Sequence, residues 1–153
     1  MEFDSWIEKS DRLRERLSLL GPESKPAWGR MGAQQMIEHL LLVCEISNGT
    51  KKAEVLTPEK HIEKAQTFLM SDQEIPKNFI AKFIPEEPIP NQFSDLNTAI
   101  NALISSIEKY HVFWKEKEET TCNHPVFGRL NKAKWNRVHN KHITHHLAQF
   151  NLL

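Results

Sequence analysis

The sequence has few of the features that mark a secreted or membrane-bound chain. Its only cysteines, Cys44 and Cys122, stand in no CxxC pattern and are too few for a disulfide framework. Its longest apolar run, Leu40 to Cys44, is far shorter than a membrane span. The N-terminal stretch MEFDSWIEKSDRLRERL alternates acids and bases and lacks the apolar core of a signal peptide. We therefore expect a reduced, cytoplasmic protein, in which the sequon at Asn48 is a chance match.

An excess of charge of one sign is also absent. Lys and Arg together number 20, Asp and Glu together number 20, and the formal net charge is zero with the histidines uncharged. The composition therefore shows neither the basic footprint of a nucleic-acid-binding protein nor a polybasic membrane arm. We expect a small-molecule partner rather than nucleic acid or a membrane. The length of 153 residues predicts one domain, residues 1–153, large enough to bury a core.

The third absence is of strand patterns, because no stretch keeps a period-two alternation and no internal repeat is found. Apolar residues instead recur every three or four positions, the spacing of amphipathic helices. Gly21-Pro22 ends the first helix, Asn48-Gly49 ends the second, and the expected N-caps of the later helices are Thr57, Ser94 and Asn131. The predicted helices are Phe3 to Leu20, Ala33 to Ser47, Glu59 to Met70, Ser94 to about Glu118, and Asn131 to about Phe150.

This order of helices predicts an all-α fold. The segment Ser71 to Phe93 contains four prolines and is expected to be irregular. Four main helices with this long crossover between the second and the third predict a four-helix bundle, in which Glu59 to Met70 is an extra short helix. The apolar positions expected to face the core of the second and third main helices are Met36, Leu40, Val43, Ile46, Leu96, Ile100, Leu103, Ile104, Ile107 and Trp114.

Histidines are concentrated in the last predicted helix, which contains the stretch HITHHLAQF. His142 and His146 are four residues apart, so they are turned by about 40° and separated by about 6 Å along the helix axis. Two imidazoles at this spacing can converge on one metal ion, as in HExxH helices. Two histidines on a solvated helix face would show the same spacing, so the pair alone leaves both interpretations open.

A tetrahedral catalytic zinc site has three protein ligands and leaves one position to water. The best third donor outside the pair is His39, which lies at the edge of the apolar stripe of the second helix. His139, about 60° from His142 on the same helix, is the rival third ligand, and its alternative role is to cover the apolar stripe. Gln149 follows His146 by three residues and can orient a bound water or a ligating imidazole.

The remaining polar residues have simpler expected roles. His145 is expected to face solvent or a subunit contact, His61 and His111 to lie on helix surfaces, and His124 to be structural. Glu38 can act as a general base but is expected to be a surface carboxylate, because it projects about 100° from His39. Cys44 is interpreted as a small core residue. Candidate pocket walls, each with core packing as its alternative role, are Trp28, Met31, Phe127 and Trp135.

Three stretches together, WGRMGAQQMIEHL, HPVFGRLNKAKW and HITHHLAQF, resemble the DinB-like metal-binding four-helix bundles, in particular the short branch catalogued as a domain of unknown function. The resemblance covers nearly the whole chain. It implies a divalent metal, zinc or nickel, held by His39 from the second helix and by His142 and His146 from the last, with water completing the site. It therefore disfavours His139 as a ligand. Relatives often form dimers, so a homodimer is expected.

Three functions follow from these observations. Characterised relatives are metal-dependent transferases or isomerases that use low-molecular-weight thiols, so the first is a transferase or hydrolase for a small, thiol-linked substrate. In that case the nucleophile is a thiol or a metal-bound water rather than a protein side chain. The second is a binding module stabilised by its metal, without catalysis. The third is a helical scaffold whose histidines bind nothing. The sequence ranks them in that order.

Overall fold

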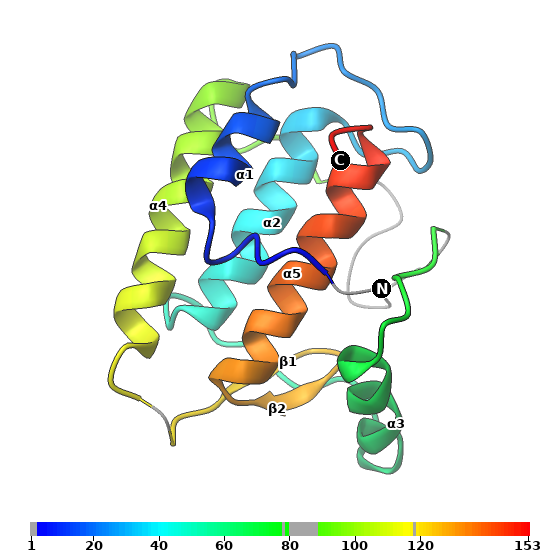
Figure 1. Ribbon diagram of the computed structural model, residues 1–153, viewed down its shortest axis with the longest axis vertical. Helices are drawn as coiled ribbons and strands as arrows, with labels where there is room; N and C mark the ends of the chain where they lie inside the picture. Colours follow the sequence, from blue (N-terminus) through cyan, green and yellow to red (C-terminus); the bar gives the residue numbers. More distant parts are fainter. Residues whose placement is uncertain (1–2, 78, 80–88, 118) are drawn as a thin grey trace.

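The computed structural model of the chain consists mainly of helices, as predicted (Figure 1). It describes residues 3–77, 79, 89–117 and 119–153. The helical fold class is confirmed, with the addition of one small hairpin. The elements are α1 (Ser10–Leu17), α2 (Ala33–Ser47), α3 (Glu59–Met70), α4 (Leu96–Trp114), β1 (Cys122–His124), β2 (Gly128–Leu130) and α5 (Lys132–Gln149).

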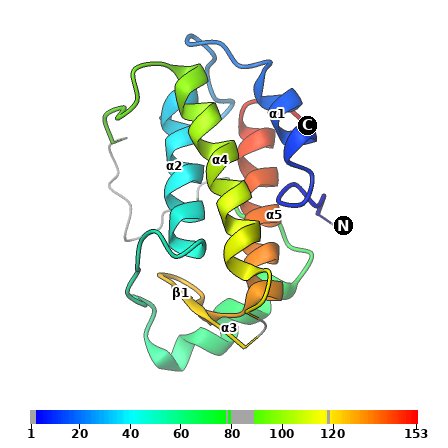
Figure 2. The same ribbon diagram turned by 90° about the vertical axis from the view of Figure 1, so that its left-hand side faces the viewer.

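Four of the helices pack side by side. Helix α2 packs on α4 and on α5, and α1 packs on α4 (Figures 1 and 2). Helix α3 packs on α5, and it lies with the hairpin at one end of the bundle in both views. The connection from α2 to α4, which contains α3, is the predicted long crossover. Residues 78 and 80–88 of its predicted irregular part, including two of the four prolines, lie outside the described residues.

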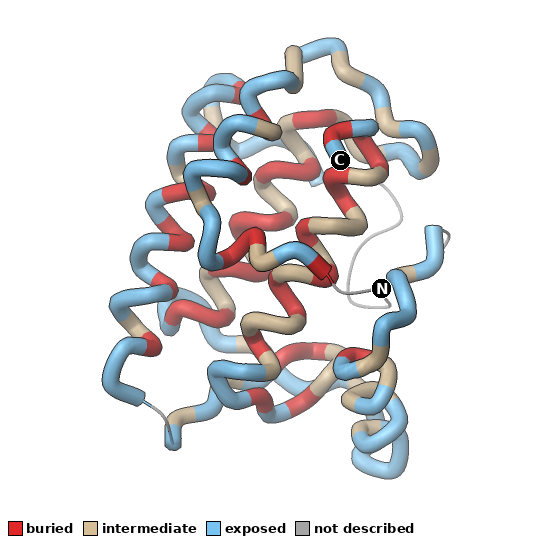
Figure 3. Tube along the Cα trace, in the orientation of Figure 1, coloured by how far each residue is buried: buried red, intermediate tan, exposed pale blue. Residues whose placement is uncertain are grey.

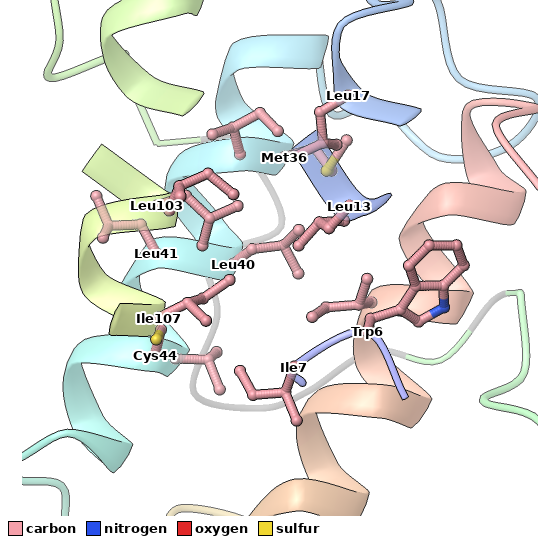
Figure 4. Close-up of a cluster of buried hydrophobic side chains, with 14 of the residues drawn as sticks. Trp6, Ile7, Leu13, Leu17, Met36, Leu40, Leu41, Cys44, Leu103 and Ile107 are labelled. Carbon is pink, nitrogen blue, oxygen red and sulfur yellow. The ribbon is translucent and has the colours of Figure 1, made fainter. Parts of the chain in front are cut away.

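The core lies where the inner faces of the four bundle helices meet (Figure 3). Nine of the ten positions predicted to face inward on α2 and α4 are buried, and the tenth, Ile46, is partly buried against the core. Figure 4 shows Met36 and Leu40 of α2 beside Leu13 and Leu17 of α1 and Leu103 of α4. Cys44 belongs to the same cluster and is 1% exposed, which confirms it as a small core residue. The α2 face that carries His39 turns away from this core, toward α5.

The first helix is shorter than predicted, because it begins at Ser10 rather than near Phe3. Phe3, Trp6 and Ile7 are buried as expected, but Trp6 and Ile7 lie in a turn and Phe3 lies in the irregular segment before it. The backbone N–H of Ile7 donates to Asn140 Oδ1 at 3.0 Å, and the Ile7 carbonyl bonds His111 Nε2 at 2.6 Å. Since these side chains occupy both backbone groups of Ile7, a helical turn there would leave its ladder incomplete.

The hairpin β1–β2 was not predicted. It pairs Cys122 with Leu130 and His124 with Gly128 in antiparallel register. The His124 ring closes the turn, because its Nδ1 accepts the backbone N–H groups of Val126 (3.0 Å) and Phe127 (3.2 Å). The structural role expected for His124 is thus confirmed, and the strands escaped prediction because three residues are too few for a period-two pattern.

The N-caps agree with the sequence at one of the three expected positions. The prediction of Thr57 as the cap of α3 was wrong, because Pro58 holds the cap position and no side chain caps this helix. Asn131 caps α5, with its side chain accepting the N–H of Lys134 at 3.0 Å. The prediction of Ser94 as the cap of α4 was wrong, because Asp95 accepts the N–H of Thr98 at 2.7 Å. Helix α4 also ends earlier than predicted, at Trp114, and residue 118 lies outside the described residues.

Two further features of the fold concern the sequon at Asn48 and the character of the helices. The Asn48 amide is buried and donates to the carbonyl and the hydroxyl of Ser106, so the sequon has a structural use in tying α2 to α4. In the described part of the chain, no helix combines the length and the apolar character that crossing a membrane requires.

A buried lysine of α5 closes the C-terminal end of α3. Lys141 Nζ donates to the carbonyls of Phe68 (2.8 Å), Ser71 (3.1 Å) and Gln73 (2.6 Å). Burial lowers the pKa of this amine to about 8, and the positive charge of Arg137 contributes in the same direction. Because the last carbonyls of a helix lack partners within it, a cation there satisfies groups that would otherwise be unpaired.

We expect Lys141→Met to destabilise the protein by about 2 kcal/mol, because the thioether fills the space but leaves the carbonyl oxygens without donors. Urea unfolding followed by circular dichroism measures the difference. The matched control is Lys60→Met on the exposed face of α3, expected within about 0.5 kcal/mol of the parent. Equal effects of the two substitutions would show that the three hydrogen bonds contribute no net stability.

Candidate metal centre

Three histidines from two helices meet on the side of the bundle where α2 faces α5. His39 comes from α2, and His142 and His146 come from successive turns of α5. The Nε2 atom of His142 lies 2.9 Å from Nε2 of His39 and 3.1 Å from Nε2 of His146. One nitrogen from each ring lies within 4.8 Å of the other two. The convergence predicted from the sequence is therefore present.

These distances fit coordination of a single ion. Zn–N bonds of 2.0–2.1 Å at tetrahedral angles place the ligand nitrogens about 3.3 Å apart. The two Nε2–Nε2 distances of 2.9 and 3.1 Å need to lengthen only by a few tenths of an ångström. Three nitrogens occupy three of the four positions of a tetrahedral site, and the fourth position is left open. The donor set is all imidazole, which suits zinc, nickel, copper and iron alike.

Hydrogen bonding alone satisfies the cluster poorly. An imidazole nitrogen presents either one proton or one lone pair in the ring plane. His142 Nε2 faces two other ring nitrogens, so one proton or one lone pair must serve both neighbours. A cation at the meeting point would accept a lone pair from every ring at once. The arrangement is thus better suited to a shared cation than to mutual hydrogen bonds.

Burial keeps these imidazoles neutral. Desolvation, followed by the charge of His145, lowers the pKa of His39 to about 4. Desolvation also holds the pKa of His142 and of His146 well below the ordinary value of 6.5, and the neighbouring histidines add to it. Only the neutral ring offers a lone pair to a metal. At neutral pH the three rings are therefore in the form that binds a cation.

Gln149 fixes the tautomer of His146. Its Oε1 lies 2.7 Å from His146 Nδ1, while its Nε2 donates to the backbone carbonyl of Trp28 at 3.0 Å. Because the Trp28 carbonyl can only accept, the amide orientation is set, and Oε1 must accept a proton from Nδ1. The lone pair of His146 then lies on Nε2, which points into the cluster. This is the outer-shell arrangement found around metal-ligating histidines.

The segment before α2 is built around Gln149. The N–H of Ala27 donates to the Gln149 carbonyl at 2.7 Å, and Gly29 has φ of +81°. A Cβ atom at Gly29 would lie 3.0 Å from Gln149 Nε2. Sequence reasoning missed Gly29. Its only signal was its place in WGRMG, which does not show that a side chain from the far end of the protein packs on it.

We expect Gln149→Leu to weaken metal affinity by about 10–100-fold, because His146 loses the acceptor that fixes its tautomer. Gln149→Glu, which keeps an acceptor for Nδ1, should bind metal more tightly than Gln149→Leu. Competition titrations with a coloured chelator measure both constants. A metal affinity of Gln149→Leu equal to that of the parent would show that Gln149 does not contribute to metal binding.

His139 does not join the cluster. It is 3% exposed, its Nε2 lies 2.7 Å from Ser47 Oγ, and its ring stacks on Trp135 at 5.5 Å. Desolvation lowers its pKa to about 3. The alternative role, covering the apolar stripe, describes it better than that of third ligand, although it is more deeply buried than a boundary residue.

The other candidate residues are placed as follows. His145 is half-buried rather than fully solvated, with its ring edge-on to Trp28 at 5.6 Å and to His146 at 5.0 Å. His61 and His111 are exposed, as expected. Glu38 is half-buried, and its carboxylate accepts the backbone N–H groups of Gln92 (2.7 Å) and Phe93 (3.4 Å). Glu38 therefore anchors the segment before α4 rather than serving as a base.

A cleft of about 1670 Å³ opens over the three histidines. Trp28, Met31 and Phe127 line it, as predicted for pocket walls. Trp135 does not line it, because it is fully buried beneath the hairpin, with Nε1 donating to the Cys122 carbonyl at 3.1 Å. The centre is thus reachable by a small molecule.

Comparison with known proteins gives one match. A family model described as "Protein of unknown function (DUF1569)" matches residues 3–152. No curated protein and no solved structure shows significant similarity to the chain.

Proposed function

The chain belongs to the DUF1569 family over nearly its whole length, and because that family has no assigned function, we propose one from the site. We propose that His39, His142 and His146 bind a divalent metal ion with one open position, and that the protein is a transferase or hydrolase for a small substrate. Zinc or nickel is the proposed ion. The observation that carries this proposal is the approach of three Nε2 atoms from two helices at the floor of a cleft.

The resemblance to DinB-like bundles supports the same assignment, since it implies the same three ligands. It also suggests a low-molecular-weight thiol as substrate or co-substrate. A bound divalent ion would supply Lewis-acid chemistry at its open position. The protein's own part is to hold three neutral ligands, to fix the tautomer of His146 through Gln149, and to shape the cleft.

The chain's own thiols are poorly suited to act as the nucleophile. Cys44 is 1% exposed, and desolvation raises its pKa to about 11. Burial also raises the pKa of Cys122, which lies on the hairpin. Since the thiolate is the reactive form, burial makes both thiols weaker nucleophiles than an ordinary cysteine. The proposed reaction therefore takes its nucleophile from solvent or from a small molecule.

A non-catalytic role is the second candidate, favoured by the position of the histidines on two helices. An ion bound to both α2 and α5 would tie together two elements that are distant in sequence. Such a protein would be a binding module stabilised by metal, as structural zinc sites stabilise their domains.

The first test measures whether the protein binds metal and gains stability from it. We expect about one zinc or nickel ion per chain by elemental analysis. At a free metal concentration of about 100 times Kd, we expect the free energy of unfolding to rise by about 2.7 kcal/mol. If no ion is bound and the melting temperature is unchanged by chelator or by added metal, the protein is a helical scaffold whose histidines bind nothing.

A second test separates the enzyme from the binding module. The metal-loaded protein is incubated with an electrophilic dye and a panel of low-molecular-weight thiols, and with ester substrates without thiol. Turnover that disappears with chelator and returns with metal supports the enzyme. A protein that binds metal but turns over nothing in any metal form supports the binding module.

A further inference from the structure

The ligands of the proposed centre carry no negative charge, and this restricts what can occupy its open position. The inference rests on the proposed metal site. Three neutral imidazoles leave both positive charges of a divalent ion uncompensated. In a partly desolvated cleft such a charge interacts far more strongly than in water, and its interaction with an anion is correspondingly favourable.

The described walls of the cleft offer little negative charge to balance it. The acidic residues that line it there are Glu38 and Glu45. The Glu38 carboxylate accepts two backbone N–H groups and the amide of Gln34, and Glu45 Oε1 lies 3.4 Å from Lys51 Nζ. The carboxylate of Glu74 acts to raise the pKa of His145, but Glu74 is exposed and does not line the cleft. The described basic lining residues are Arg30, Lys51, Lys64, Lys77, Lys109 and Lys141.

One of these cations, Lys77, is connected to the histidines through two aromatic rings. Lys77 Nζ lies 4.9 Å from the centre of the Trp28 ring. Trp28 contacts the His145 ring, which in turn contacts His146. Lys77, Trp28 and His145 therefore form a rim beside the centre, and this rim adds positive potential on the side of His146.

The rest of the wall is mostly apolar, with side chains from α2, α3, the segment after α3 and the hairpin turn. Those that line the cleft include Leu42, Val43, Phe68, Ile75 and Phe127. Apolar walls with a few convergent polar groups are typical of small-molecule sites. A ligand that buries hydrocarbon gains about 0.8 kcal/mol per CH₂ group.

From this combination we propose that the site binds a small organic anion with an apolar body. The anionic headgroup, a carboxylate or a thiolate, binds at the open metal position, and the body lies along the apolar walls. Lys77 adds to the attraction from the rim. Cations of the same shape are excluded, because the ion and the rim repel them.

The experiment uses the full chain loaded with Co²⁺, whose visible absorption changes when a ligand enters its coordination sphere. The probes are hexanoate, 1-hexanethiol, 1-hexanol, hexylamine and acetate. We expect hexanoate or hexanethiol to shift the spectrum and to bind at least about tenfold more tightly than hexanol. Acetate should bind at least about tenfold more weakly than hexanoate, because it lacks four CH₂ groups. 1-Hexanethiol is neutral in solution and binds as the thiolate by releasing its proton to the buffer. The tighter binder of hexanoate and hexanethiol identifies the headgroup.

Lys77→Gln should weaken binding of the anion about threefold to tenfold and leave Co²⁺ affinity unchanged. The matched control is Lys60→Gln, which removes a positive charge from the exposed face of α3 outside the cleft and should change neither constant. Hexylamine or hexanol binding as tightly as the anions would overturn the inference and leave the metal site standing. A chain that binds no Co²⁺ would overturn both the metal site and the inference.

Discussion

His142→Ala is expected to abolish metal binding under conditions where the parent protein is fully loaded. His142 is the central ligand, because its Nε2 lies 2.9 Å from Nε2 of His39 and 3.1 Å from Nε2 of His146. Removing it leaves only two imidazoles, His39 on α2 and His146 on α5. Loss of an outer-shell partner already costs about 10–100-fold in affinity, so loss of a ligand should cost more than about 100-fold. Competition titration with a chelator measures the change.

His139→Ala is the matched control, since it removes an imidazole one turn away on the same helix. It should keep the metal affinity of the parent, because His139 bonds Ser47 and stacks on Trp135 rather than facing the cluster. It should nevertheless destabilise the fold by about 2–4 kcal/mol, through the cavity and the lost hydrogen bond. Metal binding that survives His142→Ala but is lost in His139→Ala would reverse the ligand assignment.

The contrast between these two histidines shows what helix spacing could predict. The period of the α-helix places His142 and His146 on one face, so their convergence follows from sequence separation alone. The same geometry places His139 only about 60° from His142. Trp135 lies four residues before His139 on α5, so helix spacing could predict that the two rings meet. Helix spacing cannot show that Ser47 of α2 bonds the His139 ring, and this contact decides between the two interpretations.

Tertiary contacts also account for the error in the first helix. The apolar spacing from Phe3 to Ile7 predicted the burial of these residues correctly but their backbone wrongly. Trp6 Nε1 donates to Thr144 Oγ1 at 3.1 Å, and the N–H of Ile7 donates to Asn140 Oδ1 at 3.0 Å. Both acceptors lie on α5, and the bond from the Ile7 N–H replaces one that a helix would make, so neither contact is visible in local sequence.

Gln149 and Lys141 also differ in whether their contacts could be predicted from the sequence. Gln149 is three residues from His146 on one helix, so the contact between them could be predicted from spacing. Lys141 was not identified, because its acceptors are backbone carbonyls near the end of α3. Any residue type supplies a carbonyl, so no sequence pattern marks such a contact.

Two buried histidines outside the metal centre should make the metal-free protein sensitive to acid. Desolvation lowers the pKa of His124 and of His139 to about 3, while each has a pKa near 6.5 when the chain is unfolded. Above pH ~6.5 both states are neutral, and these residues add no pH dependence. Below that value the unfolded chain takes up protons that the folded protein refuses, so stability falls by about 1.4 kcal/mol per pH unit per histidine until the folded pKa is reached.

Between pH ~6.5 and pH ~4.5 these two residues together should therefore lower the free energy of unfolding by about 5 kcal/mol. This is a large part of the stability of a domain of this size. Urea unfolding with chelator present, at several pH values between about 7 and 4.5, measures the slope.

Because other groups titrate in the same range, His139→Gln is the informative variant: its amide keeps a donor for Ser47 Oγ but does not titrate. The variant should take up about one proton fewer on unfolding near pH ~5, so its curve should be less steep than that of the parent by about 1.4 kcal/mol per pH unit. Parallel curves would mean that His139 is protonated in the folded state as readily as in the unfolded one, and that its burial against Ser47 and Trp135 does not exclude the charge.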